Sequence, residues 1–147
     1  MKILVFGKTG QVATELQRQA EVTALGRDQA DLSDPAACAA IIAATDADVI
    51  INAAAYTAVD AAEADEALAT VINGEAPTQM AQAAAARDIP FLHVSTDYVF
   101  DGQGDQPRAV SAPTAPLNAY GRSKLVGENG IRGAKGRHAI LRTSWVF

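Results

Sequence analysis

The run Lys2-Ile3-Leu4-Val5-Phe6 is followed directly by Gly7-Lys8-Thr9-Gly10-Gln11-Val12-Ala13. A short apolar run that is closed by a glycine predicts a buried strand. The segment after it predicts a tight turn into a helix, because Gly7 and Gly10 carry no side chain that would keep a ligand from the backbone N–H groups. This order favours a phosphate-binding turn. The G-x-x-G-x-x-A spacing differs from the commoner G-x-G-x-x-G, so the motif alone also fits a purely structural turn.

Outward from this turn, short apolar runs alternate with longer helical ones. Asp34 and Pro35 are typical of a helix cap and a first helical residue, and Asn73-Gly74 is expected to break a long helical stretch. The alternation predicts an α/β fold, a doubly wound parallel sheet of the Rossmann type with right-handed crossovers, in one domain over 1–147. We expect strands over 2–6, 22–25, 48–52, 91–95 and 138–142, helices over 10–20, 34–45, 57–87 and 118–130, and a loop over 96–117.

The composition excludes several classes of protein. With 147 residues, 49% of them hydrophobic and 20% charged, the chain reads as one globular domain. A net charge of −5 without a basic cluster argues against nucleic-acid binding. No apolar run approaches the roughly 20 residues that cross a bilayer, and the apolar start is too short for a signal peptide. Cys38 is the single cysteine, so we expect no disulfide, a cytoplasmic location and a small buried side chain at this position.

Three polar residues predict proton chemistry. Tyr120 and Lys124 lie four residues apart, on one face of a predicted helix, and Thr96 lies just past a predicted strand end, where sites form in open α/β sheets. A neighbouring ammonium is expected to lower the pKa of Tyr120 toward the working range. Tyr120 would then protonate a carbonyl oxygen that Thr96 also holds, while a hydride reaches the carbon. Taken alone, Tyr120 and Lys124 also fit an ordinary helix surface pair.

Together these features resemble the short-chain dehydrogenase/reductase superfamily in its extended, nucleotide-sugar-modifying branch, and more narrowly the dTDP-4-dehydrorhamnose reductase family. The resemblance runs from Met1 to Phe147 without a gap. It rests on five ordered stretches, which are Gly7 to Val12, Asn52 to Asp60, Ser95 to Gly102, Pro116 to Lys124 and Arg142 to Trp145.

This resemblance implies an NAD(P)-binding domain and a role for each matching residue. Tyr120 would donate the proton, Thr96 would share the substrate oxygen, and Lys124 would hold the hydroxyls of the nicotinamide ribose. Gly7, Gly10, Gln11 and Val12 would meet the pyrophosphate, Asp31 and Leu32 would flank the adenine, Ala54, Ala55 and Tyr56 would line the path to the nicotinamide ribose, and Val59, Tyr98 and Trp145 would contact the dTDP-sugar. Trp145 fits a core aromatic equally well.

Arg27 bears on the choice of cofactor. An arginine at the end of the second strand accommodates a 2′-phosphate, whereas an acidic residue there suits the ribose hydroxyls of NAD. Arg27 precedes Asp28, so we expect a modest preference for NADPH, with NADH still used.

Other expectations concern the complete family. Glu15 matches a position that binds Mg²⁺ at a dimer contact in some members, which allows a Mg²⁺ ion and a homodimer, although Glu15 also reads as a solvated helix residue. His93 and His138 have no metal-like cluster around them and are interpreted as structural. Family members carry a further domain that supplies most of the sugar pocket, and this half is missing from 1–147. We therefore expect the chain alone to bind NADPH weakly and to be poorly active.

Two rival interpretations stay open. A nucleotide-sugar epimerase or dehydratase of the same branch would share the fold and the Tyr/Lys pair. A non-catalytic regulatory subunit, such as that of S-adenosylmethionine synthetase, resembles the family and keeps the nucleotide fold. The first rival would regenerate its cofactor, and the second would have no reason to keep Thr96, Tyr120 and Lys124 together.

Overall fold

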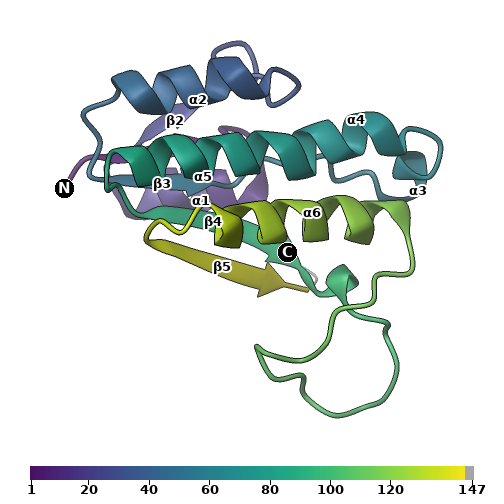
Figure 1. Ribbon diagram of the computed structural model, residues 1–147. Coiled ribbons are helices and arrows are strands. Elements are labelled where there is room, and N and C mark those ends of the chain that lie inside the picture. Colours follow the sequence, from purple (N-terminus) through teal and green to yellow (C-terminus); the bar gives the residue numbers. More distant parts are fainter. Residues whose placement is uncertain (145–147) are drawn as a thin grey trace.

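The fold is a parallel sheet between helices, as a computed structural model of residues 1–144 shows (Figure 1). The sheet has the strand order β2-β1-β3-β4-β5, and every neighbouring pair is parallel. Its strands are β1 (Ile3–Phe6), β2 (Thr23–Leu25), β3 (Val49–Asn52), β4 (Phe91–Thr96) and β5 (His138–Thr143). The doubly wound α/β fold that the sequence predicts is therefore confirmed.

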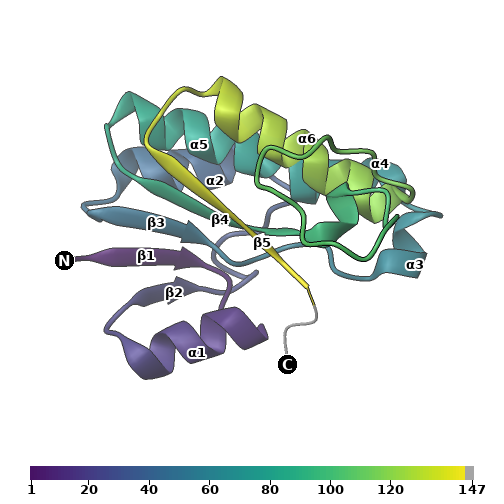
Figure 2. The same ribbon diagram turned by 90° about the horizontal axis from the view of Figure 1, so that it is seen from below.

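The helices lie in two unequal layers. Figure 2 shows α2, α5 and α6 over one face of the sheet and α1 over the other, beside β1 and β2. The helical segments are α1 (Gln11–Gln19), α2 (Pro35–Ala44), α3 (Val59–Ala62), α4 (Glu66–Thr70), α5 (Ala76–Ala86) and α6 (Ala119–Gly133), with a π-helix η1 (Val71–Glu75) and a 3₁₀ turn η2 (Asp97–Val99). None of the helices within residues 1–144 is long and apolar enough to span a bilayer.

The core lies between the sheet and the larger helical layer. Phe6, Ile50 and Phe91 from three neighbouring strands are almost fully buried against Ile42 of α2 and Met80 of α5. Burying a large apolar side chain contributes about 1.5–3 kcal/mol, so this contact fixes the helices on the sheet.

The helix α2 begins as its sequence predicts. The Asp34 carboxylate accepts a hydrogen bond from the Ala37 N–H (3.0 Å), and Pro35 occupies the first turn. Cys38 in this helix is fully buried, and burial raises the pKa of its thiol to about 11.

The expected helix break at Asn73-Gly74 is wrong. These two residues lie in the π-helix η1, which continues from α4 into α5 without interruption. Pro77 has no N–H to donate to the Asn73 carbonyl four residues earlier, and the turn widens so that Ala76 donates to Val71 instead. The interruption in this stretch lies earlier, over 63–65.

Candidate cofactor and active site

The site lies where the chain changes direction along the sheet. From β1 the chain passes through α1 to β2 on one side, whereas β3 pairs with β1 on the other side. The loops after β1 and β3 therefore diverge and leave a crevice at the carboxyl ends of the strands, as open α/β sheets do at such a switch point. Ala53 marks the edge of this crevice, because its N–H donates to Phe6 O (2.9 Å) and the chain then leaves the sheet.

Gly7 is the residue that brings the two loops together. Its φ is +112°, and a Cβ there would lie 3.2 Å from the Ala53 carbonyl carbon and 3.3 Å from Ala54 N. An L-residue would be strained in this conformation and would press on backbone atoms, which cannot move aside as a side chain can. The predicted glycine turn is thus a close backbone crossing.

The N-terminus of α1 opens into the crevice. Gly10 is the residue before the helix, no side chain caps it, and nothing lies within 4 Å of the place where its Cβ would stand. The first N–H groups of an α-helix have no partner inside the helix and carry partial positive charge, which suits an anion. Gln11 and Val12 of this first turn line the crevice. The arrangement fits a pyrophosphate.

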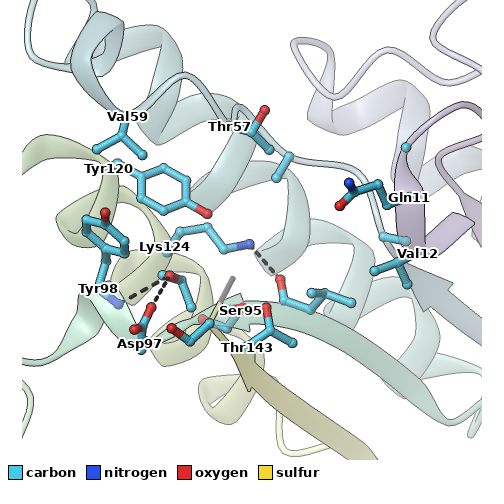
Figure 3. Close-up of a pocket in the computed structure, with 16 residues that line it drawn as sticks. Gln11, Val12, Thr57, Val59, Ser95, Asp97, Tyr98, Tyr120, Lys124 and Thr143 are labelled. Atoms are coloured by element: carbon cyan, nitrogen blue, oxygen red, sulfur yellow. Dashed lines mark hydrogen bonds between the residues drawn. The ribbon is translucent and has the colours of Figure 1, made fainter. Parts of the chain in front are cut away.

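Two adjoining cavities make up the crevice. The Asp31 cavity is lined by Gly7, Lys8, Thr9, Gly10, Leu25, Gly26, Arg27, Asp28, Ala30, Asp31, Leu32, Ala53, Ala54, Ala55, Thr57 and Ile72. The Tyr120 cavity is lined by Gly10, Gln11, Val12, Ala53, Ala55, Thr57, Val59, Val94, Ser95, Thr96, Asp97, Tyr98, Tyr120, Lys124, Thr143 and Ser144 (Figure 3). Gly10, Ala53, Ala55 and Thr57 belong to both, so an elongated ligand can extend from one cavity into the other.

Thr96, Tyr120 and Lys124 meet in the Tyr120 cavity. Figure 3 shows the phenol oxygen of Tyr120 and the amine of Lys124 on the same side of this cavity. The Thr96 hydroxyl accepts from Tyr98 N–H (3.2 Å) and donates to an Asp97 carboxylate oxygen (3.2 Å). The Tyr98 ring stands edge-on to that of Tyr120, with 5.7 Å between centroids. The Tyr98 ring and the Thr96 hydroxyl therefore line the same cavity as the Tyr120 phenol.

The electrostatics of Tyr120 differ from the prediction. Burial raises its pKa above the ordinary value, nearby Asp97 and Tyr98 raise it further, and interaction with Thr96 lowers it only in part. Lys124 does not contribute the expected lowering of this pKa, and its amine donates to Val94 O. In this structure Tyr120 is therefore a protonated phenol at neutral pH, which is the form that a proton donor needs.

Lys124 is almost completely buried, at 1% exposure. Its Nζ donates to Val94 O (2.7 Å) and lies 3.2 Å from Nε2 of His93. Burial lowers the pKa of Lys124 to about 8, and the nearby Glu128 carboxylate opposes this shift. The contact with His93 was not predicted from the sequence, in which His93 is interpreted as a structural residue.

Two further polar residues hold the site together and were missed. Asn73 accepts from Tyr56 N–H (2.8 Å) and donates to Tyr56 O (3.0 Å) and to Ser123 Oγ (3.0 Å), so it joins the loop after β3 to α6. Glu128 lies beneath β4, where it binds Arg142 and Ser95 at 2.7 Å each. Both are fully buried polar side chains, and this is a property that the sequence does not display.

Tyr56 does not line the crevice. Its ring packs with Tyr120 against Ala62, Ala69 and Ala119, whereas its neighbours Ala55 and Thr57 face the cavities. The remaining predicted residues of the described chain all line one cavity or the other. Trp145 lies outside the described residues.

Arg27 and Asp31 form a pair at the rim of the Asp31 cavity. Arg27 Nε lies 3.1 Å from an Asp31 carboxylate oxygen, and both side chains are partly or largely exposed. Hydrogen bonds from Ser33 and then Arg27 hold the pKa of Asp31 below its usual range. Asp28 folds back so closely that a Cβ on Gly26 would lie 2.5 Å from its Oδ1. The rim thus presents a cation and two carboxylates.

A metal site at Glu15 finds no support. Glu15 accepts from Arg18 (3.3 Å) and Gln19 (2.8 Å) on the surface of α1. Within residues 1–144, no group of three or more His, Cys, Asp or Glu side chains is placed to hold a metal ion.

The chain is similar throughout to known sugar-nucleotide reductases. The family model described as the RmlD substrate binding domain matches residues 1–147. The dTDP-4-dehydrorhamnose reductase of Burkholderia thailandensis is 50% identical over an alignment that covers 100% of this chain and 51% of that protein. The structure of a dTDP-4-dehydrorhamnose reductase from Clostridium acetobutylicum matches with a TM-score of 0.94 at 35% identity, covering 100% of this chain and 54% of that one.

A third relative carries a cofactor. The structure of dTDP-4-dehydrorhamnose reductase from Bacillus anthracis in complex with NADP matches with a TM-score of 0.90 at 31% identity, over 99% of this chain and 54% of that one. The present chain spans about half the length of the relatives that it matches. From the match over its whole length, the chain belongs to the RmlD substrate binding domain family.

Proposed function

We propose that residues 1–147 are the cofactor-binding half of an NAD(P)H-dependent reductase that converts the 4-keto group of dTDP-4-dehydro-L-rhamnose to the alcohol of dTDP-L-rhamnose. The observation that carries the proposal is the pair of adjoining cavities. One end opens at the uncapped first turn of α1, and the other end holds Thr96, Tyr120 and Lys124. Family membership then indicates which reaction this arrangement serves.

The residues present fit a dinucleotide. Gly7 and Gly10 leave the backbone open to a pyrophosphate at the start of α1, with Gln11 and Val12 beside it. The Asp31 cavity would take the adenosine half, between Leu32 and Ala54, and Arg27 at its rim suits a 2′-phosphate. The NADP in the Bacillus anthracis relative supports NADPH as the preferred form.

Tyr120, Thr96 and Lys124 have different roles in the proposed reaction. NADPH, when bound, supplies the hydride. Tyr120 gives its phenol proton to the developing alkoxide, and its raised pKa keeps that proton available at neutral pH. The Thr96 hydroxyl turns from Asp97 to the same oxygen and fixes the carbonyl. Lys124 holds the ribose hydroxyls with its N–H groups.

The sugar nucleotide would enter from the side of Val59 and Tyr98, which line the outer part of the Tyr120 cavity. Tyr98 is 42% exposed and offers a ring face for the sugar. Trp145, outside the described residues, is proposed as a further contact to the sugar nucleotide. The opposite wall would come from a second half such as the relatives possess, so residues 1–147 alone bind cofactor but turn over substrate poorly.

The test uses Tyr120→Phe in a chimera that joins residues 1–147 to the second half of the Burkholderia thailandensis relative. Loss of the proton donor should lower kcat by about 10²–10⁴, the usual worth of general acid–base catalysis, with NADPH binding within a few-fold of the parent. Tyr98→Phe is the matched comparison, because the same hydroxyl is lost from the neighbouring ring. It should change KM for the sugar nucleotide more than kcat.

Two results would contradict the proposal. Hydride transfer by Tyr120→Phe at nearly the parental rate in stopped-flow measurements would remove Tyr120 from the proton donor's role. Conversion of the substrate without net consumption of NADPH would favour an epimerase, which regenerates its cofactor.

A further inference from the structure

Lys124, His93 and Asn52 form a buried chain of polar contacts behind the Tyr120 cavity. Asn52 ends β3, His93 lies in the neighbouring β4, and Lys124 reaches them from α6. Asn52 and His93 are 0% exposed and Lys124 is 1% exposed. Buried polar groups are hydrogen-bonded in native structures, so each donor here is expected to face an acceptor.

The amide of Asn52 sets the direction of the hydrogen bonds among Asn52, His93 and Lys124. Its Oδ1 accepts a hydrogen bond from Ala54 N–H (3.1 Å), in the loop that lines both cofactor cavities. The Nδ2 group therefore faces His93 Nδ1, at 3.1 Å. An amide nitrogen only donates, so Nδ1 of His93 must be the acceptor.

The proton of the neutral His93 ring then lies on Nε2, and Nε2 faces Lys124 Nζ at 3.2 Å. A charged ammonium has three donors and no lone pair, so this contact would set two N–H groups against each other. An uncharged amine accepts from Nε2–H and still donates to Val94 O, its second partner at 2.7 Å. The observed geometry is satisfied only by the uncharged form of Lys124.

The titratable and charged groups around Lys124 are consistent with an uncharged amine. Tyr120 and Glu128 approach from α6, and Asp97 and Tyr98 lie across the same cavity on η2. Glu128 is the nearest source of negative charge, but Arg142, Arg132 and Ser95 already bind its carboxylate. The pKa of His93 is lowered well below its ordinary value by burial and then by Lys124, so the ring stays neutral.

We infer that Asn52 and His93 are positioning residues that control the charge of Lys124: Asn52 fixes His93 as the Nε2–H tautomer, and His93 thereby favours the uncharged amine while the cavity is empty of ligand. Charging Lys124 then requires the amine to leave Nε2 and turn toward the cavity. An anionic dinucleotide favours the charged form, so its binding is coupled to the uptake of a proton by Lys124. The uptake of a proton on dinucleotide binding rests on the proposed function, whereas the assignment of the His93 tautomer does not.

The tautomer is measured by ¹⁵N NMR of the unliganded chain with labelled histidine rings. The chain has two histidines, and the exposed His138 is removed by His138→Gln, so that the remaining signals belong to His93. We expect the Nε2–H tautomer throughout the range from about pH 6 to pH 10, without ring protonation. An Nδ1–H tautomer would overturn the inference.

Two variants separate this control from simple burial, with the Lys124 titration followed by NMR of its Cε and Nζ. Asn52→Asp offers only acceptors, so it should move His93 to the Nδ1–H tautomer and raise the Lys124 midpoint by at least about one pH unit. His93→Phe removes the facing donor at similar volume, so the midpoint should rise. If burial alone set the midpoint, the more apolar phenylalanine would lower it, and that result would overturn the inference.

Proton uptake on NADPH binding tests whether the charge of Lys124 is coupled to the cofactor. Calorimetric titration of the chain with NADPH, in buffers of different ionisation enthalpy at about pH 9, should show uptake of a substantial fraction of one proton per cofactor, because Lys124 with a pKa of about 8 is mostly uncharged at that pH before NADPH binds. Asn52→Asp should take up much less. NADPH binding without proton uptake would overturn the coupling, and failure of NADPH to bind at all would instead count against the proposed function.

Discussion

Alanine at Gly7 should damage both the fold and the cofactor site. A non-glycine residue at a φ of +112° costs about 1–3 kcal/mol. The new Cβ would also press on Ala53 and Ala54 backbone atoms at 3.2 and 3.3 Å, which must shift by a few tenths of an ångström. We expect a loss of about 2 kcal/mol in the free energy of unfolding, or roughly 4–8 °C in Tm for a chain of this size.

Gly10→Ala is the matched control, because the added methyl group meets no atom within 4 Å and the backbone φ is −70°. Its free energy of unfolding should stay within about 1 kcal/mol of the parent. Under the proposed function, its methyl group would stand where the pyrophosphate approaches α1, so NADPH binding should weaken. Urea unfolding without cofactor and calorimetric titration with NADPH measure the two effects. A Gly7→Ala chain as stable as Gly10→Ala would refute the close backbone crossing.

Three further predictions concern other parts of the molecule. Arg27→Ala should lower the preference for NADPH over NADH, measured as the ratio of their dissociation constants; an unchanged ratio would exclude Arg27 as the discriminator. Gly127→Ala should lower the free energy of unfolding by about 1–3 kcal/mol, since its Cβ would lie 2.2 Å from a carbonyl oxygen of η1. Gly133→Ala in the same helix is the control, because its Cβ would have no atom within 4 Å. In urea unfolding this control should be as stable as the parent or slightly more stable. Glu128→Gln should cost about 3 kcal/mol at pH 7, because it removes the buried carboxylate that pairs with Arg142, whose side chain is only 15% exposed. Burial alone would raise the pKa of Glu128, but its hydrogen bonds with Arg142, Ser95 and Arg132 hold that pKa below the ordinary value. The parent should therefore lose its extra free energy of unfolding only as pH falls below about 4.5, through the folded-state pKa of Glu128. A difference between parent and variant that stays constant over this pH range would contradict the prediction.

The backbone plan could be predicted from the sequence because it depends on local patterns. The apolar run that closes at Gly7 marks a strand and a turn, and Asp34-Pro35 marks a helix start through its own hydrogen bond. The alternation of such segments leaves few sheet topologies, and the order β2-β1-β3-β4-β5 is one of the commonest for parallel sheets. The motifs also indicated which strand ends would carry Thr96 and the glycine turn.

The charges of the site could not be predicted in this way. A spacing of four residues places Tyr120 and Lys124 on one helix face, but it does not say that the lysine turns to His93 and Val94 on another element. The same limit applies to Tyr56, whose ring is drawn into a small apolar cluster by residues far along the chain. Side-chain direction and burial depend on contacts that form only in the folded molecule.

The division of the crevice into two cavities bears on how such a chain can diversify. All residues of 25–32 except Gln29 line the Asp31 cavity, and none of them lines the Tyr120 cavity, whereas Tyr120 and Lys124 line only the latter. Substitutions that share no partners add in their effects on the free energy of unfolding, so changes at 25–32 and changes in α6 should combine additively in stability. Under the proposed function, a directed-evolution library confined to 25–32 should change the preferred nucleotide while Thr96, Tyr120 and Lys124 keep their contacts.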